Sequence, residues 1–201
     1  IACNCDVCKS ANPKDKRLRS SVMIENKGKI FVIDTGPDFR QQMLRENVSN
    51  LTAVIFTHEH KDHVAGLDDV RAFNFIQCKP MEVYATEFVQ KAIQREFHYV
   101  FSGPEYPGVP KINLNLIDGE NPFAIDGVEF IPIRVFHYKM PVLGFRVGDF
   151  TYITDANKIP EREKEKIRNS KILVLNALRR ESHLSHFTLD QAVEMMKELK
   201  P

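Results

Sequence analysis

The sequence lacks the features that would place it in a membrane or on a nucleic acid. Its longest apolar runs, such as Leu51–Phe56, are far too short to cross a bilayer, and no signal peptide is visible. We therefore expect a cytoplasmic protein with no membrane partner. The formal net charge is +1, with Lys and Arg interleaved among Asp and Glu, so no global field attracts nucleic acid. A small-molecule substrate is favoured over a long polymer. A homodimer is compatible with the sequence.

Cysteine is also scarce, with four residues in the chain, three of them at Cys3, Cys5 and Cys8. A chain of 201 residues with 43% hydrophobic residues can build a substantial core as one domain over 1–201, so it needs no disulfide framework. The C-x-C-x-x-C run therefore favours thiolate ligands of a structural zinc that lacks one ligand. Free thiols are the alternative. Cys78 stands alone, and we expect it to be a small buried side chain.

The hydrophobic pattern predicts many short strands interrupted by helices. Expected strands cover residues 21–25, 29–33, 51–57, 81–85, 113–117, 123–125, 128–134, 144–147, 150–154 and 172–176. Expected helices cover residues 39–46, 68–75, 87–100 and 160–168, and a last helix opens at Thr188 with a capping box to Gln191. Residues 101–110, with two Gly and three Pro, predict a loop. Strand-rich halves flanked by helices predict an α+β fold with αββα layering.

Both ends of the chain suggest a truncated domain. The chain opens on Ile1 without a Met and closes on Pro201, directly after the amphipathic stretch Leu189–Lys200. A domain usually follows such a helix with a strand or a tail, so we expect both ends to be truncated.

The strongest chemical signal is the segment Thr57–His63, which reads THEHKDH. It places three imidazoles and a carboxylate directly after a buried strand, and these groups are the ligands that Zn²⁺ or Mn²⁺ prefers. His58 and His60 can point to one side of an extended turn, whereas Asp62 and His63 begin the next segment. The spacing therefore predicts two neighbouring metal sites.

The H-x-H-x-D-H motif after a hydrophobic strand, with Asp-Thr-Gly upstream at residues 34–36, resembles the metallo-β-lactamase superfamily. The resemblance implies an αββα sandwich with two metals at one edge, between the sheets. It further implies that His58, His60 and His137 bind one metal, and that Asp62, His63 and a further His bind the other. Asp155 would bridge the two metals. Asp34 would orient ligands without binding metal.

The cysteine run narrows the resemblance to the branch that holds the cyclic-phosphate phosphodiesterase of phosphonate breakdown. In that branch the cysteines and a C-terminal His hold a structural zinc, and a loop His before the penultimate helix is proposed as the catalytic acid. His186 is at the matching position, and His183 is its rival. Two parts of the family pattern have no counterpart in the chain: the first strand, and a last strand with Thr-His-x-x-His-like residues. The two histidines of that last strand would complete the second metal site and the zinc site at the cysteines.

We therefore expect a binuclear metal-dependent hydrolase, with Asp62 and His186 as its catalytic residues. The resemblance favours a phosphodiesterase for a small phosphodiester, such as a cyclic ribose or nucleotide-like phosphate. Two divalent ions, Zn or Mn, would activate water and neutralise charge on the phosphoryl group. The alternatives are tRNA 3′-end processing, thioester or lactam hydrolysis, and a non-hydrolytic role like that of the pyrroloquinoline-quinone maturation protein, which has a similar cysteine motif.

Overall fold

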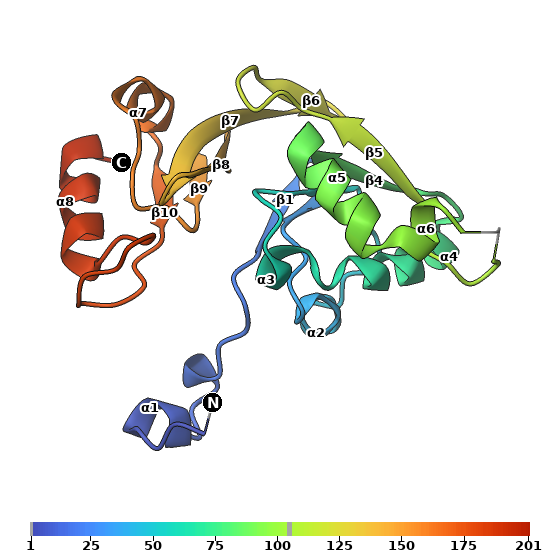
Figure 1. Cartoon of the computed structure of the whole chain (residues 1–201), viewed down its shortest axis with the longest axis horizontal. Coiled ribbons are helices and arrows are strands. Elements are labelled where there is room, and N and C mark those ends of the chain that lie inside the picture. Colours follow the sequence, from blue (N-terminus) through green and yellow to red (C-terminus); the bar gives the residue numbers. More distant parts are fainter. Residues whose placement is uncertain (1, 104–105) are drawn as a thin grey trace.

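The computed structural model describes residues 2–103 and 106–201, and its strands form two five-stranded sheets, one from each half of the chain (Figure 1). The first sheet contains, in spatial order, β1 (Val22–Asn26), β2 (Lys29–Ile33), β3 (Ala53–Ile55), β4 (Met81–Ala85) and β5 (Ile112–Leu116). The second contains β10 (Ile172–Leu175), β9 (Phe150–Ile153), β8 (Met140–Val147), β7 (Val128–His137) and β6 (Phe123–Ile125).

Helices follow the same division between the halves. Those of the first half are α2 (Phe39–Arg45), α3 (Lys61–Val64), the 3-10 turn η2 (Leu67–Val70), α4 (Arg71–Gln77), α5 (Glu87–Glu96) and α6 (His98–Phe101). Those of the second half are α7 (Glu161–Ile167) and α8 (Leu189–Leu199), the latter opened by the predicted capping box at Thr188. Two short elements, α1 (Asp6–Lys9) and η1 (Pro13–Asp15), precede the sandwich.

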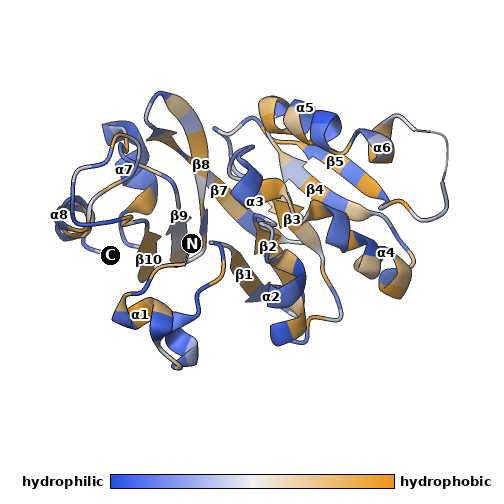
Figure 2. Ribbon diagram, turned by 60° about the horizontal axis from the view of Figure 1, so that its bottom comes forward, coloured by the Kyte–Doolittle hydropathy of each residue, from blue (hydrophilic) through white to orange (hydrophobic). Residues whose placement is uncertain are grey.

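Three hydrophobic clusters separate four layers, which confirms the predicted αββα sandwich. Strand β2 shows why, because it is buried on both faces: Val32 packs with α2, α4 and α5, whereas Phe31 and Ile33 pack against the second sheet. A third cluster packs the other face of the second sheet against α7 and α8. In Figure 2 the strands are largely hydrophobic, whereas the helices carry both hydrophobic and hydrophilic residues, as expected for helices with one face on a sheet.

Three sequence predictions need correction. The helix predicted over 87–100 is broken at Phe97, whose φ of −108° and ψ of 42° lie outside the helical range, so α5 and α6 are separate. Cys78 is exposed rather than buried, because it ends α4 in a left-handed conformation beside the exposed Phe75. The loop predicted over 101–110 begins one residue later, after α6, and its residues 104–105 lie outside the described residues.

The sheets bring chain segments that are far apart in sequence to one edge of the sandwich. Strands β2 to β5 are parallel, so the segments that follow β2 and β3 leave the sheet on the same side. Asp34 follows β2, and Asp155 comes soon after β9. Both have left-handed backbones, with φ of 65° and 51°. Among the described helices, none is long and apolar enough to cross a membrane.

Candidate metal centre

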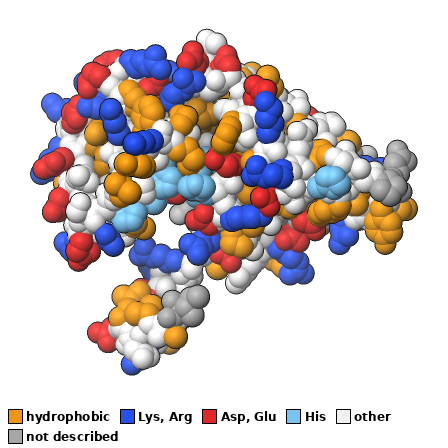
Figure 3. Space-filling model, viewed as in Figure 1, with side chains coloured by type: hydrophobic (Ala, Val, Ile, Leu, Met, Phe, Trp, Pro, Cys, Tyr) orange, Lys and Arg blue, Asp and Glu red, His pale blue; other side chains and the backbone are white. Residues whose placement is uncertain are grey.

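The histidines of the H-x-H-x-D-H segment lie close to His137, which ends β7 in the other sheet. Ring centroids are 4.7 Å apart for His58 and His60, and 5.2 Å apart for His60 and His137. The ring of His186, from the loop before α8, lies 4.6 Å from that of His137. In the space-filling view, pale-blue histidine side chains gather near the middle of the face, with Lys and Arg side chains around them (Figure 3).

Asp155 connects these histidines in two groups. In the first group, ligand atoms of His58, His60 and Asp155 all lie within 4.8 Å of one another. In the second group the same holds for His137, Asp155 and His186. One carboxylate shared by two groups is the arrangement expected of a bridge between two cations. The second group also includes His186, whose Nε2 is 3.4 Å from Oδ2 of Asp155.

Asp62 and His63 lie at the margin of these groups. The Nε2 atom of His63 is 3.4 Å from Oδ2 of Asp155 and 3.9 Å from Oδ2 of Asp62. The side chain of Asp62 is 45% exposed, and its Oδ2 is 3.9 Å from Nη1 of Arg19. The structure therefore brings His63 against the shared carboxylate, whereas Asp62 is held less tightly and also faces a basic residue.

Asp34 organises the buried side of the site. Its carboxylate accepts hydrogen bonds from the backbone N–H and the hydroxyl of Thr57, at 2.9 and 2.8 Å. It also accepts from Nδ1–H of His63 at 2.7 Å. Because the Thr57 hydroxyl proton is directed to Asp34, Oγ1 of Thr57 can only accept from Nδ1–H of His58, 2.9 Å away. The carboxylate thus orients two imidazoles, as the resemblance implied for this position.

These hydrogen bonds engage Nδ1 of His58 and His63, and Nε2 of both imidazoles lies within 4 Å of the carboxylate of Asp155. His137 follows the same rule, since its Nδ1–H donates to the carbonyl of Ser185 at 2.9 Å. Nε2 of His58 is buried and has no hydrogen-bond partner in the structure. A buried polar nitrogen is seldom left unpaired, and a divalent cation is the partner that such a nitrogen in a set of imidazoles and carboxylates would take. The residues therefore fit a metal.

The pKa shifts of the site indicate that positive charge is favoured between the carboxylates of Asp34 and Asp155. Burial lowers the pKa of His58 to about 2, so this imidazole is neutral. Burial alone would also lower the pKa of His63, but hydrogen bonds to Asp155 and Asp34 raise it to about 10. Burial acts to raise the pKa of Asp155, yet the hydrogen bond from His63 holds it well below its usual range. The carboxylates of Asp34 and Asp155 thus favour positive charge at His63, which is the environment that a bound cation would also meet.

Some residues that support the site had no signal in the sequence. The side-chain carbonyl of Asn157 accepts from the backbone N–H of Tyr138 at 2.9 Å, and its amide donates to the carbonyl of Leu184 at 2.9 Å. One Asn therefore connects the loops that carry His137, Asp155 and His186. An Asn in a loop is too common to reveal such a role. Gly36, by contrast, belongs to the Asp-Thr-Gly segment that carried the resemblance, and a Cβ there would lie 2.3 Å from the carbonyl oxygen of Asp62.

A cavity of about 320 Å³ opens on this cluster. Its lining is mainly polar near the ligands and includes Arg19, Ser20, Asp62, Asp155, Asn176 and His186. The lining thus places a guanidinium, hydroxyl and amide groups and the imidazole of His186 beside the carboxylates of Asp62 and Asp155.

A family model described as the β-lactamase superfamily domain matches residues 29–201. The chain belongs to the metallo-β-lactamase superfamily. A solved structure described as a new diphosphatase from the PhnP family is 38% identical and has a TM-score of 0.90. That likeness covers 100% of this chain and 77% of the other, and it places this superfamily member in the PhnP-like branch.

Two curated relatives of this superfamily member carry other names. An octanoyltransferase of Porphyromonas gingivalis is 38% identical over 201 residues, which are 99% of this chain and 40% of that protein. A ribonuclease Z of Methanococcus maripaludis is 25% identical over 162 residues, which are 79% of this chain and 50% of that protein. The chain thus spans half or less of the length of these two relatives.

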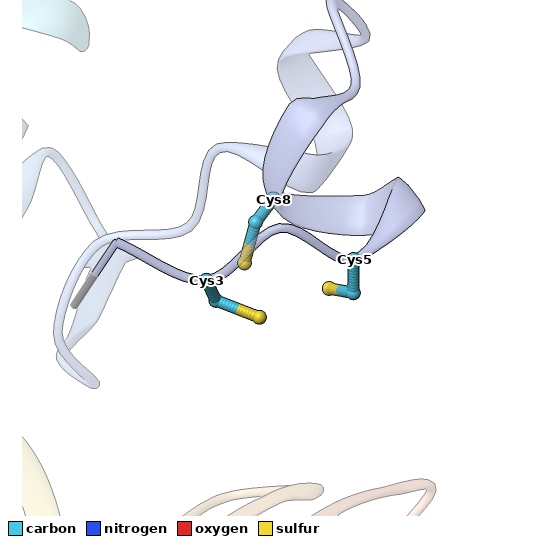
Figure 4. Close-up of side chains that lie close together, drawn as sticks. All are labelled: Cys3, Cys5 and Cys8. Atoms are coloured by element: carbon cyan, nitrogen blue, oxygen red, sulfur yellow. The ribbon is translucent and has the colours of Figure 1, made fainter.

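The three clustered cysteines of this superfamily member lie far from the histidines. They are on an N-terminal arm, residues 2–16, which extends away from both sheets in Figure 1. Ligand atoms of Cys3, Cys5 and Cys8 lie within 4.8 Å of one another, and Figure 4 shows their sulfur atoms directed toward a common point. A hydrogen bond from the backbone of Cys8 lowers the pKa of Cys5 to about 7, whereas the hydrogen bond with Cys5 raises the pKa of Cys8 to about 11, so the thiol of Cys5 ionises before that of Cys8. The structural zinc stays a prediction.

Replacing Cys3, Cys5 and Cys8 together by Ser should remove one zinc per chain and leave hydrolysis unchanged. The reason is that no residue of α1 is buried, while the histidine cluster is built from later elements. Elemental analysis and an activity assay check this result, and trypsin should cleave the arm faster once the zinc is lost. Cys78→Ser, at the remaining exposed cysteine, is the control and should change neither. Unchanged zinc content in the triple variant contradicts the zinc assignment.

Proposed function

We propose that the chain is a metal-dependent phosphodiesterase that acts on a small phosphodiester. The observation that carries the proposal is the convergence of histidines from both sheets on Asp155, around the buried and unpartnered Nε2 of His58. The diphosphatase described above supports attack at phosphorus, because its likeness covers the whole of this chain. Hydrolysis of a phosphodiester and hydrolysis of a diphosphate both break a P–O bond at an anionic phosphorus, which is the group that such a site would hold.

Following the ligand roles that the resemblance implied, His58, His60 and His137 would hold one divalent cation, and Asp62 and His63 the other. Asp155, which belongs to both ligand groups of the structure, would be shared by the two cations. Zn²⁺ or Mn²⁺ in these positions supplies Lewis acidity and lowers the pKa of water. The remaining chemistry falls to the side chains of the chain itself.

Two residues of the small cavity would handle the substrate directly. Arg19 presents a guanidinium next to Asp62, where it can pair with a phosphate oxygen. His186 presents Nε2 at 3.4 Å from Oδ2 of Asp155, inside the same cavity. We assign to His186 the delivery of a proton to the leaving oxygen. Nδ1 of His183 is 3.2 Å from Nδ1 of His186 and is better placed to support that imidazole than to replace it.

The names of the two curated relatives suggest an octanoyl group or RNA as the substrate, whereas the charge and side chains of this protein favour a small phosphodiester. A net charge of +1 gives no broad field for RNA, in contrast to what a long nucleic-acid substrate needs. The described histidine groups consist of imidazoles and a carboxylate, which suit a metal-assisted hydrolysis. The 40% share of the octanoyltransferase that this chain matches leaves most of that protein without a counterpart here.

Hydrolysis of bis(p-nitrophenyl) phosphate tests the proposal. Protein loaded with Mn²⁺ or Zn²⁺ should release p-nitrophenolate, and chelation should stop the reaction. His60→Ala should lose the activity, whereas His98→Ala, at an exposed histidine on α6, should keep it. An octanoyl thioester should not be turned over in parallel. Absence of phosphodiester hydrolysis with either metal, in protein that binds the metal, contradicts the proposal.

A further inference from the structure

A second and larger cavity, of about 650 Å³, opens beside the histidines. It shares none of its lining residues with the smaller cavity at Asp155. Its walls come from the start of α5, the segment after β5, and the strands β7 and β8. The volume is within the usual range for a site that holds a small organic molecule.

The cavity adjoins the backbone that holds the metal ligands. Thr57 and Glu59, which line it, flank His58 in the chain. Met140, another lining residue, pairs with His137 across the β7–β8 hairpin. The backbone N–H of Leu143 donates to the carbonyl of Thr57 at 3.1 Å, which joins the two segments. A group in this cavity would therefore be held close to a phosphate at the histidines.

The walls of the cavity are mostly apolar. Val89, Ile117 and Leu143 are buried in its lining, whereas Phe88 and Leu116 are 65% and 67% exposed. Large apolar side chains left open to water around a hollow are typical of a ligand site, because a bound apolar group would cover them. In Figure 3, hydrophobic side chains lie next to the histidines on the upper side of the view.

One charged group of this lining has no partner of its own. Glu87 pairs with Lys91, Arg134 pairs with Glu120, and Asp118 accepts hydrogen bonds from the following turn. Among the described charged residues of the cavity, Glu59 alone makes neither an ion pair nor a side-chain hydrogen bond. Its carboxylate is half-buried and can accept a hydrogen bond from a hydroxyl or amino group of a ligand.

The position of His186 decides which part of a phosphodiester this cavity would take. His186, assigned above as the proton donor to the leaving oxygen, lines the smaller cavity. The leaving group therefore belongs on that side, and the substituent that stays on phosphorus belongs on the other. We propose that the larger cavity binds the retained substituent of the substrate, and that this substituent is an apolar ring system with a hydroxyl or amino group directed at Glu59. The inference rests on the proposed function.

The inference is tested with two esters that release the same p-nitrophenolate, namely phenyl p-nitrophenyl phosphate and methyl p-nitrophenyl phosphate. Phe88→Gln removes an apolar wall at the second residue of α5 without adding charge. In the metal-loaded protein it should lower kcat/KM about tenfold for the phenyl ester, mainly through KM, and leave the methyl ester unchanged. Phe75→Gln, at a residue that is 67% exposed on α4, is the matched control. Equal losses on both esters, or no loss on either, overturn the inference.

A binding measurement separates this inference from the proposed function. Fluorescence titration with 1-naphthylphosphonate, which has no ester bond to cleave, should show weaker binding to Phe88→Gln than to the wild type or Phe75→Gln. If neither ester is hydrolysed but the naphthyl probe shows this difference, the proposed function fails and the cavity assignment stands. Binding that Phe88→Gln does not weaken overturns the assignment, whatever the turnover.

Discussion

Asp155→Asn should leave the protein folded and lower phosphodiesterase activity by at least about 10³-fold, which corresponds to the several kcal/mol that metal ions supply to such reactions. The Oδ2 atom of Asp155 is 3.4 Å from Nε2 of both His63 and His186, and 3.8 Å from Nε2 of His58. Asn has the same shape and also tolerates the left-handed φ of 51°, so the backbone should be retained. The loss comes from the missing negative charge between two cations.

Metal content per chain, measured together with kcat/KM, checks this expectation. We expect Asp155→Asn to retain less metal than the wild type after dialysis. Asp149→Asn is the matched control, since Asp149 is an exposed carboxylate that pairs with Lys171 in the second half of the chain. Full activity and full metal content in Asp155→Asn would show that this carboxylate bridges nothing.

His186→Ala should lower turnover of an alkyl or ribose phosphodiester by about 10²–10⁴-fold, the range of general acid catalysis. A leaving alkoxide has a high pKa and needs a proton, whereas p-nitrophenolate leaves without one. The p-nitrophenyl ester should therefore lose much less activity, with metal content unchanged. His98→Ala, at an exposed histidine on α6, is the control, and His183→Ala is measured beside it because His183 contacts His186.

The turnover rates of the two esters and the metal content together test this prediction. Equal losses on both esters refute the acid role. Loss of a metal makes His186 a ligand instead, as its place with His137 and Asp155 within 4.8 Å allows. A larger loss in His183→Ala than in His186→Ala reverses the assignment between the two histidines.

The fold was predictable from the sequence because strands such as β2 and β3 are apolar on both faces, which indicates a layer on each side. The grouping of His58 and His60 was predictable because these residues are close in the chain. Placing His137 and Asp155 with them depended on the family resemblance, since nothing local connects residues so far apart. The break of the 87–100 helix at Phe97 depended on tertiary packing that overrides helical periodicity.

The larger cavity had no signal in the sequence. Its walls come from Glu59, Phe88, Leu116 and Met140, which are ordinary apolar or acidic residues on separate elements. The orientation of His58 and His63 through Thr57 and Asp34 was only partly foreseen, because the hydroxyl of Thr57 becomes a bridge only when β2 and β3 lie side by side.

The division of the two sheets between the halves of the chain also divides the ligands. The first half contributes Asp34, Thr57 and the H-x-H-x-D-H segment. His137 and Asp155 come from the second half. A cation bound by ligands of both halves would therefore join the two sheets as well as serve the reaction.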